Sequence, residues 1–105
     1  MIHYIESNQL MNEVLKSQKL VIVEFYIPNS KPCEIQHEIL RKLEKEFENE
    51  IEVFKIDITE SQESIMIYNI SAYPSLIFFK DNSEIERKVG VLDENTISNL
   101  IHELK

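Results

Sequence analysis

The sequence predicts a single α/β domain in which helices cover both faces of a central mixed β-sheet. Strand-like and helix-like stretches alternate along the 105 residues. A β-branched and aromatic run at 20–27 is typical of a strand buried on both faces. Two late strand-like stretches flank a short turn and indicate an antiparallel hairpin. A chain of this length holds one core, so we expect one domain over residues 1–105.

The first half of the chain is predicted to form two strands and two helices. Residues 2–5 are expected to form a short edge strand, and Ser7 is expected to cap the helix after it. The apolar residues of that helix recur at helical spacing: Leu10, Met11, Val14 and Leu15. A central strand at 20–27 is followed by a helix at 31–49. The inward face of this second helix contains Cys33, Gln36, Leu40, Leu43 and Phe47.

The second half is predicted to add three strands and two helices. A strand at 53–58 precedes residues 59–62, which resemble a capping box, and a short helix that runs to Tyr68. Strands at 75–80 and 85–89 flank a three-residue turn, and Asp93 is expected to cap the closing helix. The order β-α-β-α-β-α-β-β-α implies right-handed crossovers, parallel central strands and one antiparallel edge.

Charge and composition exclude several classes of function. The 19 acidic residues outnumber the 11 basic ones, which gives a formal charge of −8. Such a surface repels phosphate backbones, so we expect no nucleic-acid partner. The longest apolar run contains Glu24 and is too short to span a bilayer, so we expect no membrane partner. Gly90 is the only glycine, which excludes glycine-rich phosphate-binding loops.

Cysteine usage points to a reducing compartment. Cys33 is the only cysteine, so an intrachain disulfide is excluded. The first residues carry no basic stretch followed by a long apolar segment, and we therefore expect a cytoplasmic location. We expect a monomer without a cofactor. His37 lies four residues after Cys33 and could pair with it, but no further ligand converges by spacing, so no metal site is predicted.

Four segments, in this order along the chain, resemble the thioredoxin family. Residues 23–26 (VEFY) lead into 27–33 (IPNSKPC), where the family has a strand followed by Trp-Cys-Gly-Pro-Cys. Residues 73–75 (YPS) look like the segment that carries the family's cis-proline, and 88–90 (KVG) match its closing strand and glycine. The resemblance spans about residues 2–104 and implies the thioredoxin fold, with helices on both faces of a mixed sheet.

The chain departs from the family at the reactive turn. Ser30 stands where the family has its nucleophilic cysteine, Asn29 replaces the tryptophan and Lys31 replaces the glycine. Thiol–disulfide exchange requires a thiolate, which a serine cannot supply. The dithiol cycle is therefore expected to be lost. Ser30 is instead expected to cap the backbone N–H of Cys33, with Pro32 in the first helical turn.

Cys33 corresponds to the second, resolving cysteine of the family. A place in the first turn of a helix favours a reactive thiol, whereas burial favours a small packed apolar residue, and exposure decides between them. Glu24 stands where the family carries a buried acid that moves protons to and from this cysteine. Burial should favour its neutral form, or it could meet water or the amine of Lys55, which matches a lysine common in the family.

Pro74 completes the site that the resemblance implies. A cis bond before it would turn the backbone of Tyr73 toward the Cys33 turn, where an extended substrate could pair with it. Alternatively, Pro74 only starts a strand and Tyr73 packs as an aromatic. The implied catalytic positions are Ser30, Cys33, Glu24 and Lys55. The implied substrate-binding positions are Asn29, Lys31, Pro32, Tyr73, Pro74, Gly90 and Val91.

Three functions follow from these residues. The first is a thioredoxin-family protein that keeps single-thiol chemistry at Cys33, with protein thiols or disulfides as partners. The second is a binding module that holds an extended segment in the groove beside Pro74. The third is an ordinary protein-disulfide reductase supplied by a thioredoxin reductase, which requires Ser30 to be an engineered replacement of a cysteine.

Overall fold

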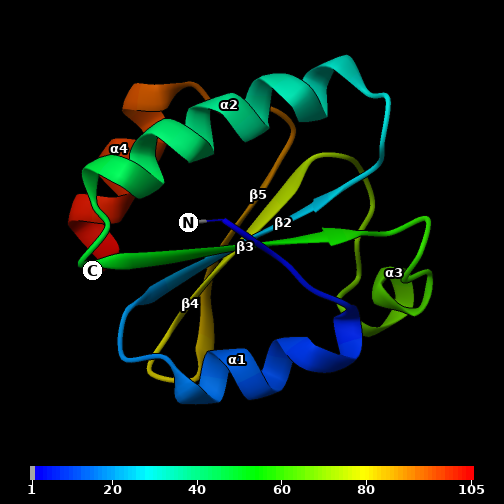
Figure 1. Cartoon of the computed structure of the whole chain (residues 1–105), viewed down its shortest axis with the longest axis horizontal. Coiled ribbons are helices and arrows are strands. Elements are labelled where there is room, and N and C mark those ends of the chain that lie inside the picture. Colours follow the sequence, from blue (N-terminus) through cyan, green and yellow to red (C-terminus); the bar gives the residue numbers. More distant parts are fainter. Residues whose placement is uncertain (1) are drawn as a thin grey trace.

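The computed structural model describes residues 2–105 and consists of a five-stranded sheet between helices (Figure 1). The strands are β1 (His3–Tyr4), β2 (Leu20–Tyr26), β3 (Ile51–Asp57), β4 (Ser75–Lys80) and β5 (Ser83–Val89). The helices are η1 (Ser7–Gln9), α1 (Leu10–Lys16), α2 (Lys31–Glu46), α3 (Glu63–Ile67) and α4 (Glu94–Leu104). This is the predicted order of elements, with a short 3₁₀ turn added before α1.

The sheet has the predicted mixed topology, with strand order β1-β3-β2-β4-β5. Strand β3 pairs in parallel with β1 and β2, whereas β4 runs antiparallel to both β2 and β5. The predicted edge strand at 2–5 is therefore real, although only two of its residues pair. The central strand β2 is buried along almost its whole length, as its apolar sequence predicts.

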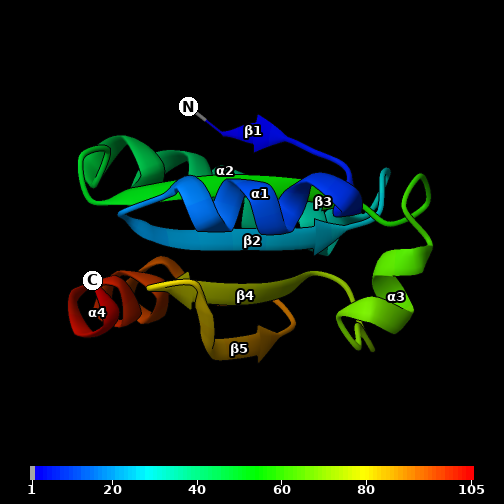
Figure 2. The same ribbon diagram turned by 90° about the horizontal axis from the view of Figure 1, so that it is seen from below.

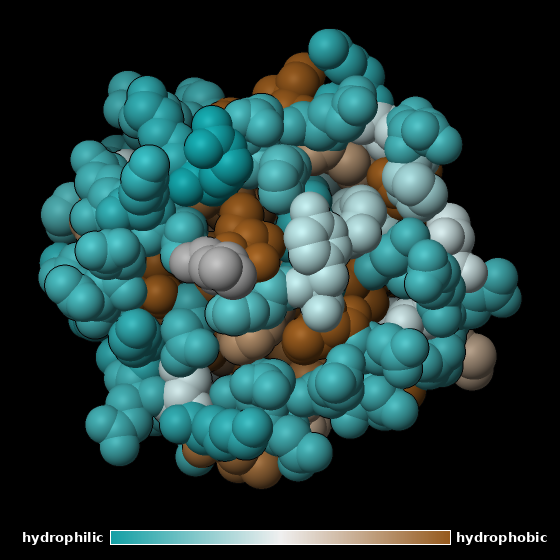
Figure 3. Space-filling view, in the orientation of Figure 1, coloured by the Kyte–Doolittle hydropathy of each residue, from teal (hydrophilic) through white to brown (hydrophobic). Residues whose placement is uncertain are grey.

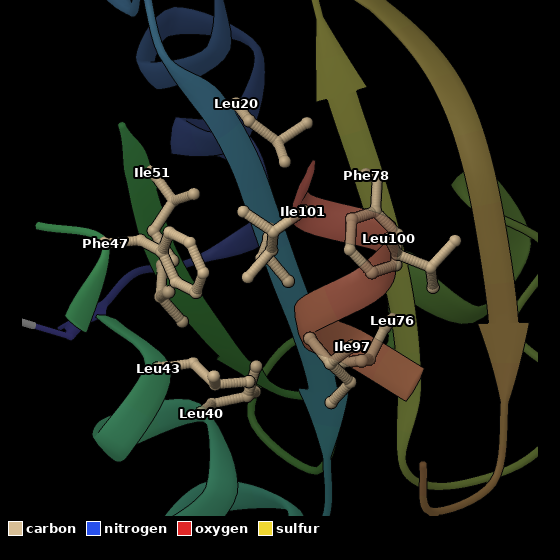
Figure 4. Close-up of a cluster of buried hydrophobic side chains, with 12 residues drawn as sticks. Leu20, Leu40, Leu43, Phe47, Ile51, Leu76, Phe78, Ile97, Leu100 and Ile101 are labelled. Atoms are coloured by element: carbon tan, nitrogen blue, oxygen red, sulfur yellow. The ribbon is translucent and has the colours of Figure 1, made fainter. Parts of the chain in front are cut away.

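Helices cover the two faces of the sheet (Figures 1 and 2). Alternate side chains of β2 enter two separate cores because successive residues of a strand point to opposite faces. Leu20 and Ile22 join the core under α2 and α4. Figure 4 shows Leu20 among the side chains of this core. Val21, Val23 and Phe25 join the core on the α1 side. Two apolar layers thus hold a rigid sheet whose end carries the candidate site.

Register brings three chain segments together at one end of the sheet. Phe25 near the end of β2 pairs with Ser75 at the start of β4, and Ser75 pairs with Val89 at the end of β5. The turn after β2, the residues before β4 and the residues after β5 therefore meet there. Figure 2 shows β2 and β5 pointing to this end while β4 starts from it.

Polar side chains set the turns and helix starts. Asp81 and Asn82 have φ angles of 50° and 69°, which suit the two-residue hairpin between β4 and β5. The turn is thus shorter than the predicted three residues, and β5 begins at Ser83 instead of 85. Asp93 caps α4 as predicted: its Oδ1 accepts a hydrogen bond from the Thr96 N–H at 2.8 Å.

Two predicted helix caps are wrong. Glu6, and not Ser7, precedes the first helical turn, and its N–H donates to Gln9 Oε1 at 2.8 Å. The Ser7 hydroxyl instead donates to Glu63 Oε1 at 2.6 Å and ties the N-terminal segment to α3. Thr59 forms no capping box either, because its N–H donates to Asp57 Oδ1 in a local turn.

Helix α2 ends at Glu46, earlier than the predicted residue 49. Phe47 is buried against the core under α2 and α4, and its carbonyl accepts a hydrogen bond from the Glu50 N–H at 2.8 Å. This turn ends the helix and starts β3 at Ile51, two residues before the predicted strand. The predicted inward face of α2 is confirmed, since all five of its residues are buried.

One face of the molecule is mainly hydrophilic (Figure 3). Hydrophilic residues cover most of the face seen in Figure 3, in keeping with the formal charge of −8. Within residues 2–105, no helix is both long and apolar enough to cross a bilayer. The predicted apolar stripe of α1 is only half buried: Leu10 and Val14 pack inward, while Met11 and Leu15 are 44% and 61% exposed.

Candidate functional site

The turn from β2 into α2 is built by Asn29, Ser30 and Pro32. Asn29 has a φ of 59°, in the left-handed region that asparagine tolerates better than a bulky residue. Ser30 is the N-cap of α2, and its hydroxyl accepts a hydrogen bond from the Cys33 N–H at 3.3 Å. Pro32 lies in the first turn, where its missing N–H costs nothing. The predicted capping role of Ser30 is therefore confirmed.

Cys33 is buried, with 3% of its surface exposed, and it is the only cysteine of the chain. It lies on the inward face of α2 and lines an open cavity of about 730 Å³. This cavity is bounded by the first half of α2, the turn before it and residues of β1, β2 and β3. Asn29, Lys31 and Lys55 also line it, so four of the predicted site residues meet around one hollow.

Glu24 and Lys55 form a buried ion pair next to this cavity. The two residues pair in register across β2 and β3, and Lys55 Nζ lies 3.2 Å from Glu24 Oε1. Their side chains are 0% and 4% exposed. Within residues 2–105, neither carboxylate oxygen accepts a hydrogen bond. Burial raises the pKa of Glu24 from 4.5 to about 7, and the charge of Lys55 opposes this rise.

His37 and two tyrosines complete the surroundings of Lys55. Lys55 Nζ lies 2.9 Å from His37 Nδ1, 4.2 Å from the centre of the Tyr26 ring and 5.7 Å from that of Tyr4. Cation–π attraction to the rings adds to the stabilisation of the ammonium group. Burial, together with the charge of Lys55, lowers the pKa of His37. His37 is thus bonded to Lys55 and not, as the helical spacing suggested, to Cys33.

The segment around Pro74 has the backbone that the resemblance implies. The Tyr73–Pro74 peptide bond is cis. The Pro74 carbonyl accepts a hydrogen bond from the Gly90 N–H at 2.8 Å, and Gly90 has a φ of 85° that favours glycine. These residues lie at the end of the sheet where β2 runs into α2. Neither Tyr73, Pro74, Gly90 nor Val91 lines the cavity beside Cys33.

Gln36 joins α2 to the loop after β5. Its side chain is fully buried, and it makes two hydrogen bonds with Leu92: the Leu92 N–H donates to Oε1 at 2.8 Å, and Nε2 donates to the Leu92 carbonyl at 3.2 Å. The sequence placed Gln36 on the inward face but gave it no role. The sequence nevertheless contained an indication of this role: a glutamine on an otherwise apolar helix face is buried, and a buried amide needs hydrogen-bond partners.

We expect Gln36→Leu to lower the free energy of unfolding by about 1–3 kcal/mol, because it leaves the N–H and C=O of Leu92 without partners. Urea unfolding measures this loss. The same change at the exposed residue Gln18 is the matched control and should stay within about 0.5 kcal/mol of the parent. Equal effects at the two positions would show that the Gln36 bonds do not stabilise the fold.

Histidines, cysteines and acidic residues do not gather into a group that could hold a metal ion anywhere in residues 2–105. The chemically active groups of the site are therefore the Cys33 thiol, the Glu24–Lys55 pair and His37. Together they offer one sulfur and, around or beside the cavity that Cys33 lines, a set of groups that can hold or transfer a proton.

Comparisons with known proteins agree with this architecture. The sequence model of the Thioredoxin family matches residues 1–103. The thioredoxin of Chlamydia pneumoniae is 36% identical over 83 residues, which cover 79% of this chain and 80% of that protein. The thioredoxin of Rickettsia prowazekii is 26% identical over 102 residues, which cover 97% of each chain.

A solved structure supports the same fold. The crystal structure of chloroplastic thioredoxin z superposes with a TM-score of 0.89 at 20% identity, covering 97% of this chain and 92% of that one. The predicted α/β fold, with helices on both faces of a mixed sheet, is thereby confirmed. The match to the family's sequence model spans nearly the whole chain, and the chain belongs to the thioredoxin family.

Proposed function

We propose that this chain does not complete the dithiol cycle and instead reacts with disulfides through the single thiol of Cys33. Members of the thioredoxin family act on protein disulfides. One observation carries the proposal: Cys33 is the only cysteine, and the residue three positions before it is a serine whose hydroxyl serves as a helix cap. A hydroxyl forms no disulfide, so the first step of the family's cycle, which is attack by a cysteine at this position, cannot take place.

The proposed reaction is a single exchange step. The Cys33 thiol loses its proton to water, and the thiolate attacks one sulfur of a disulfide. The Cys33 S–S bond forms as the disulfide of the partner breaks, and the leaving thiolate takes a proton from water. The partner disulfide is the oxidant and Cys33 is oxidised. Without a second cysteine in the chain, the mixed disulfide persists until an outside thiol releases it.

Oxidised glutathione tests this function directly. We expect at most one glutathione per folded chain, because the chain offers one sulfur. Intact-protein mass spectrometry measures the adduct. Cys33→Ala should abolish it, and Ser30→Ala should preserve it, since the cap does not react. A folded chain that forms no adduct would rule out the single-thiol function.

A binding module without chemistry is the second candidate, and the 3% exposure of Cys33 favours it. In this case the groove beside the cis bond before Pro74 holds an extended segment by backbone pairing. The probe is a reduced protein whose thiols are capped with iodoacetamide, because it is extended and cannot form a disulfide. Binding that is equal for the parent and Cys33→Ala would support the module, and absence of binding by both would exclude it.

We also propose a compartment, an oligomeric state and an electron donor for this chain. A single cysteine without a disulfide partner suits a reducing cytoplasm, where we place the protein as a monomer. A thioredoxin reductase enters as electron donor only if the natural residue 30 is a cysteine, because a reductase needs a disulfide to reduce.

A further inference from the structure

We propose that Cys33 is reached through the cavity between α2 and strands β1–β3, and that its partners are low-molecular-weight disulfides. This inference rests on the single-thiol function proposed above and names its substrate class. It differs from the route that the family resemblance implies, in which a protein segment lies in the groove beside Pro74. The cavity that Cys33 lines contains none of the residues predicted to rim that groove on the β4 and β5 side.

The burial of Cys33 bears on which disulfides can reach it, whether from the cavity or from the groove beside Pro74. Cys33 is 3% exposed, so a disulfide held on the surface of a folded protein cannot bring its sulfur to this thiol without displacing other residues. The cavity offers Cys33 a space of about 730 Å³. Small-molecule sites usually enclose roughly 300–1,000 Å³, which suits a compact disulfide and not a protein domain. The small exposed fraction of Cys33 thus excludes a disulfide held rigidly on a protein surface, whereas the open space beside Cys33 has room for a compact disulfide.

The walls of the cavity suit a small, amphipathic molecule. Tyr4 and Tyr26 meet edge to face with their ring centres 6.3 Å apart, and Ile35 and Ile39 add apolar surface from α2. These groups can pack against the carbon atoms of a ligand. The polar groups of the lining include Lys31, which stands in the first turn of α2.

His37 supplies a hydrogen-bond donor to the same space. The Lys55 ammonium group can only donate, so His37 Nδ1 accepts from it across 2.9 Å. The neutral ring then carries its proton on Nε2. Since His37 lines the cavity one helical turn after Cys33, this N–H is available to a ligand bound there. A donor near the reacting sulfur can stabilise the negative charge that develops on the leaving thiolate.

The exchange step inside the cavity follows the chemistry given above. The Cys33 thiolate attacks the small disulfide, one S–S bond forms on Cys33 and the S–S bond of the ligand breaks. The released thiolate leaves the cavity and takes a proton from water, and the other half of the ligand remains bound to Cys33. The ligand itself is the oxidant, so no further reagent is required.

Tryptophan variants distinguish the routes. Ile35 lines the cavity and is 44% exposed, whereas Ile85 in β5 lies outside the cavity and is 41% exposed. Their similar exposure means that both positions accept a larger side chain without loss of core packing. The probe is bis(2-hydroxyethyl) disulfide, which is small and uncharged, so the charge of −8 does not affect its approach. Intact-protein mass spectrometry gives the rate of adduct formation at a fixed pH.

We expect Ile35→Trp to slow formation of the adduct at least about tenfold and Ile85→Trp to leave the rate within about twofold, since only the first fills the cavity. Val91→Trp, on the predicted groove, tests the other route: a rate that falls for Val91→Trp and not for Ile35→Trp would place the approach on the groove side. If Ile35→Trp and Val91→Trp both form the adduct at the rate of the parent, Cys33 reacts after local unfolding of the chain and through neither route. Either result overturns the inference and leaves the single-thiol function intact. A parent that forms no adduct contradicts the single-thiol function itself.

Discussion

Replacing Ser30 with cysteine is expected to create protein-disulfide reductase activity in this chain. The variant would carry two sulfurs, one at the N-cap of α2 and one at Cys33, three residues further on. The new thiolate could then attack a substrate disulfide, and Cys33 could release the reduced substrate by forming an internal disulfide. The fold already contains the buried carboxyl of Glu24, paired with Lys55.

The measurement is reduction of insulin disulfides with a constant supply of dithiothreitol. We expect Ser30→Cys to exceed the parent by roughly 100-fold, because a thiolate replaces a hydroxyl that cannot take part in exchange. The loss of the serine cap should lower the free energy of unfolding by only about 1 kcal/mol. Ser30→Ala is the matched control, since it also loses the cap but gains no thiol.

Failure of the Ser30→Cys variant would also be informative. If neither Ser30→Cys nor the parent turns over, the differences at Asn29 and Lys31 have altered the site beyond its missing sulfur. The binding module would then be the better account of the chain. If the parent itself reduces insulin at the rate of the variant, the proposed loss of the dithiol cycle is wrong.

The fold was predictable because its signals are local and repeated. An apolar run with β-branched residues specifies β2, and an acidic cap followed by apolar residues at helical spacing specifies α4. The cap predicted at Ser7 failed because of a contact between distant residues. The Ser7 hydroxyl does not cap a helix; it donates a hydrogen bond to Glu63, which lies 56 positions away in the sequence. No local pattern near Ser7 contains that information.

The candidate site was predictable in its parts but not in its connections. The sequence left water or Lys55 as the partner of Glu24, and the structure pairs it with Lys55. The resemblance implied the cis bond before Pro74, which is present. The bond between Lys55 and His37 depends on how α2 packs over β3, which helical spacing alone cannot give. The cavity beside Cys33 also arises from packing, since its walls come from β1, β2, β3 and α2 together.

The burial of Glu24 predicts a loss of stability as the pH rises. The pKa of this carboxyl is about 7 in the folded protein and 4.5 in the reference state, so the native state binds more protons between these values. The free energy of unfolding therefore decreases through this window and levels off above pH 7. A shift of this size corresponds to roughly 3 kcal/mol, which is a large part of the stability of a small domain.

The contribution of Glu24 can be isolated by comparing the parent with Glu24→Gln, which keeps the size of the side chain but does not titrate. His37 works in the opposite direction, because its lowered pKa makes the native state bind fewer protons, and its contribution rises with pH. Since both proteins contain His37, its effect cancels in the difference between their free energies of unfolding. We expect that difference, variant minus parent, to increase by roughly 3 kcal/mol from pH 4 to pH 8.

Urea unfolding at pH 4 and pH 8 measures this increase, and the exposed Glu46→Gln is the control that should keep the pH dependence of the parent. A constant difference for Glu24→Gln would mean that Lys55, at 3.2 Å, offsets the cost of burying the charge. Glu24 would then remain ionised through the neutral range and could not give a proton to a thiolate at Cys33. An increasing difference instead identifies Glu24 as a buried acid that changes its protonation near neutral pH, the property a group needs in order to exchange protons there.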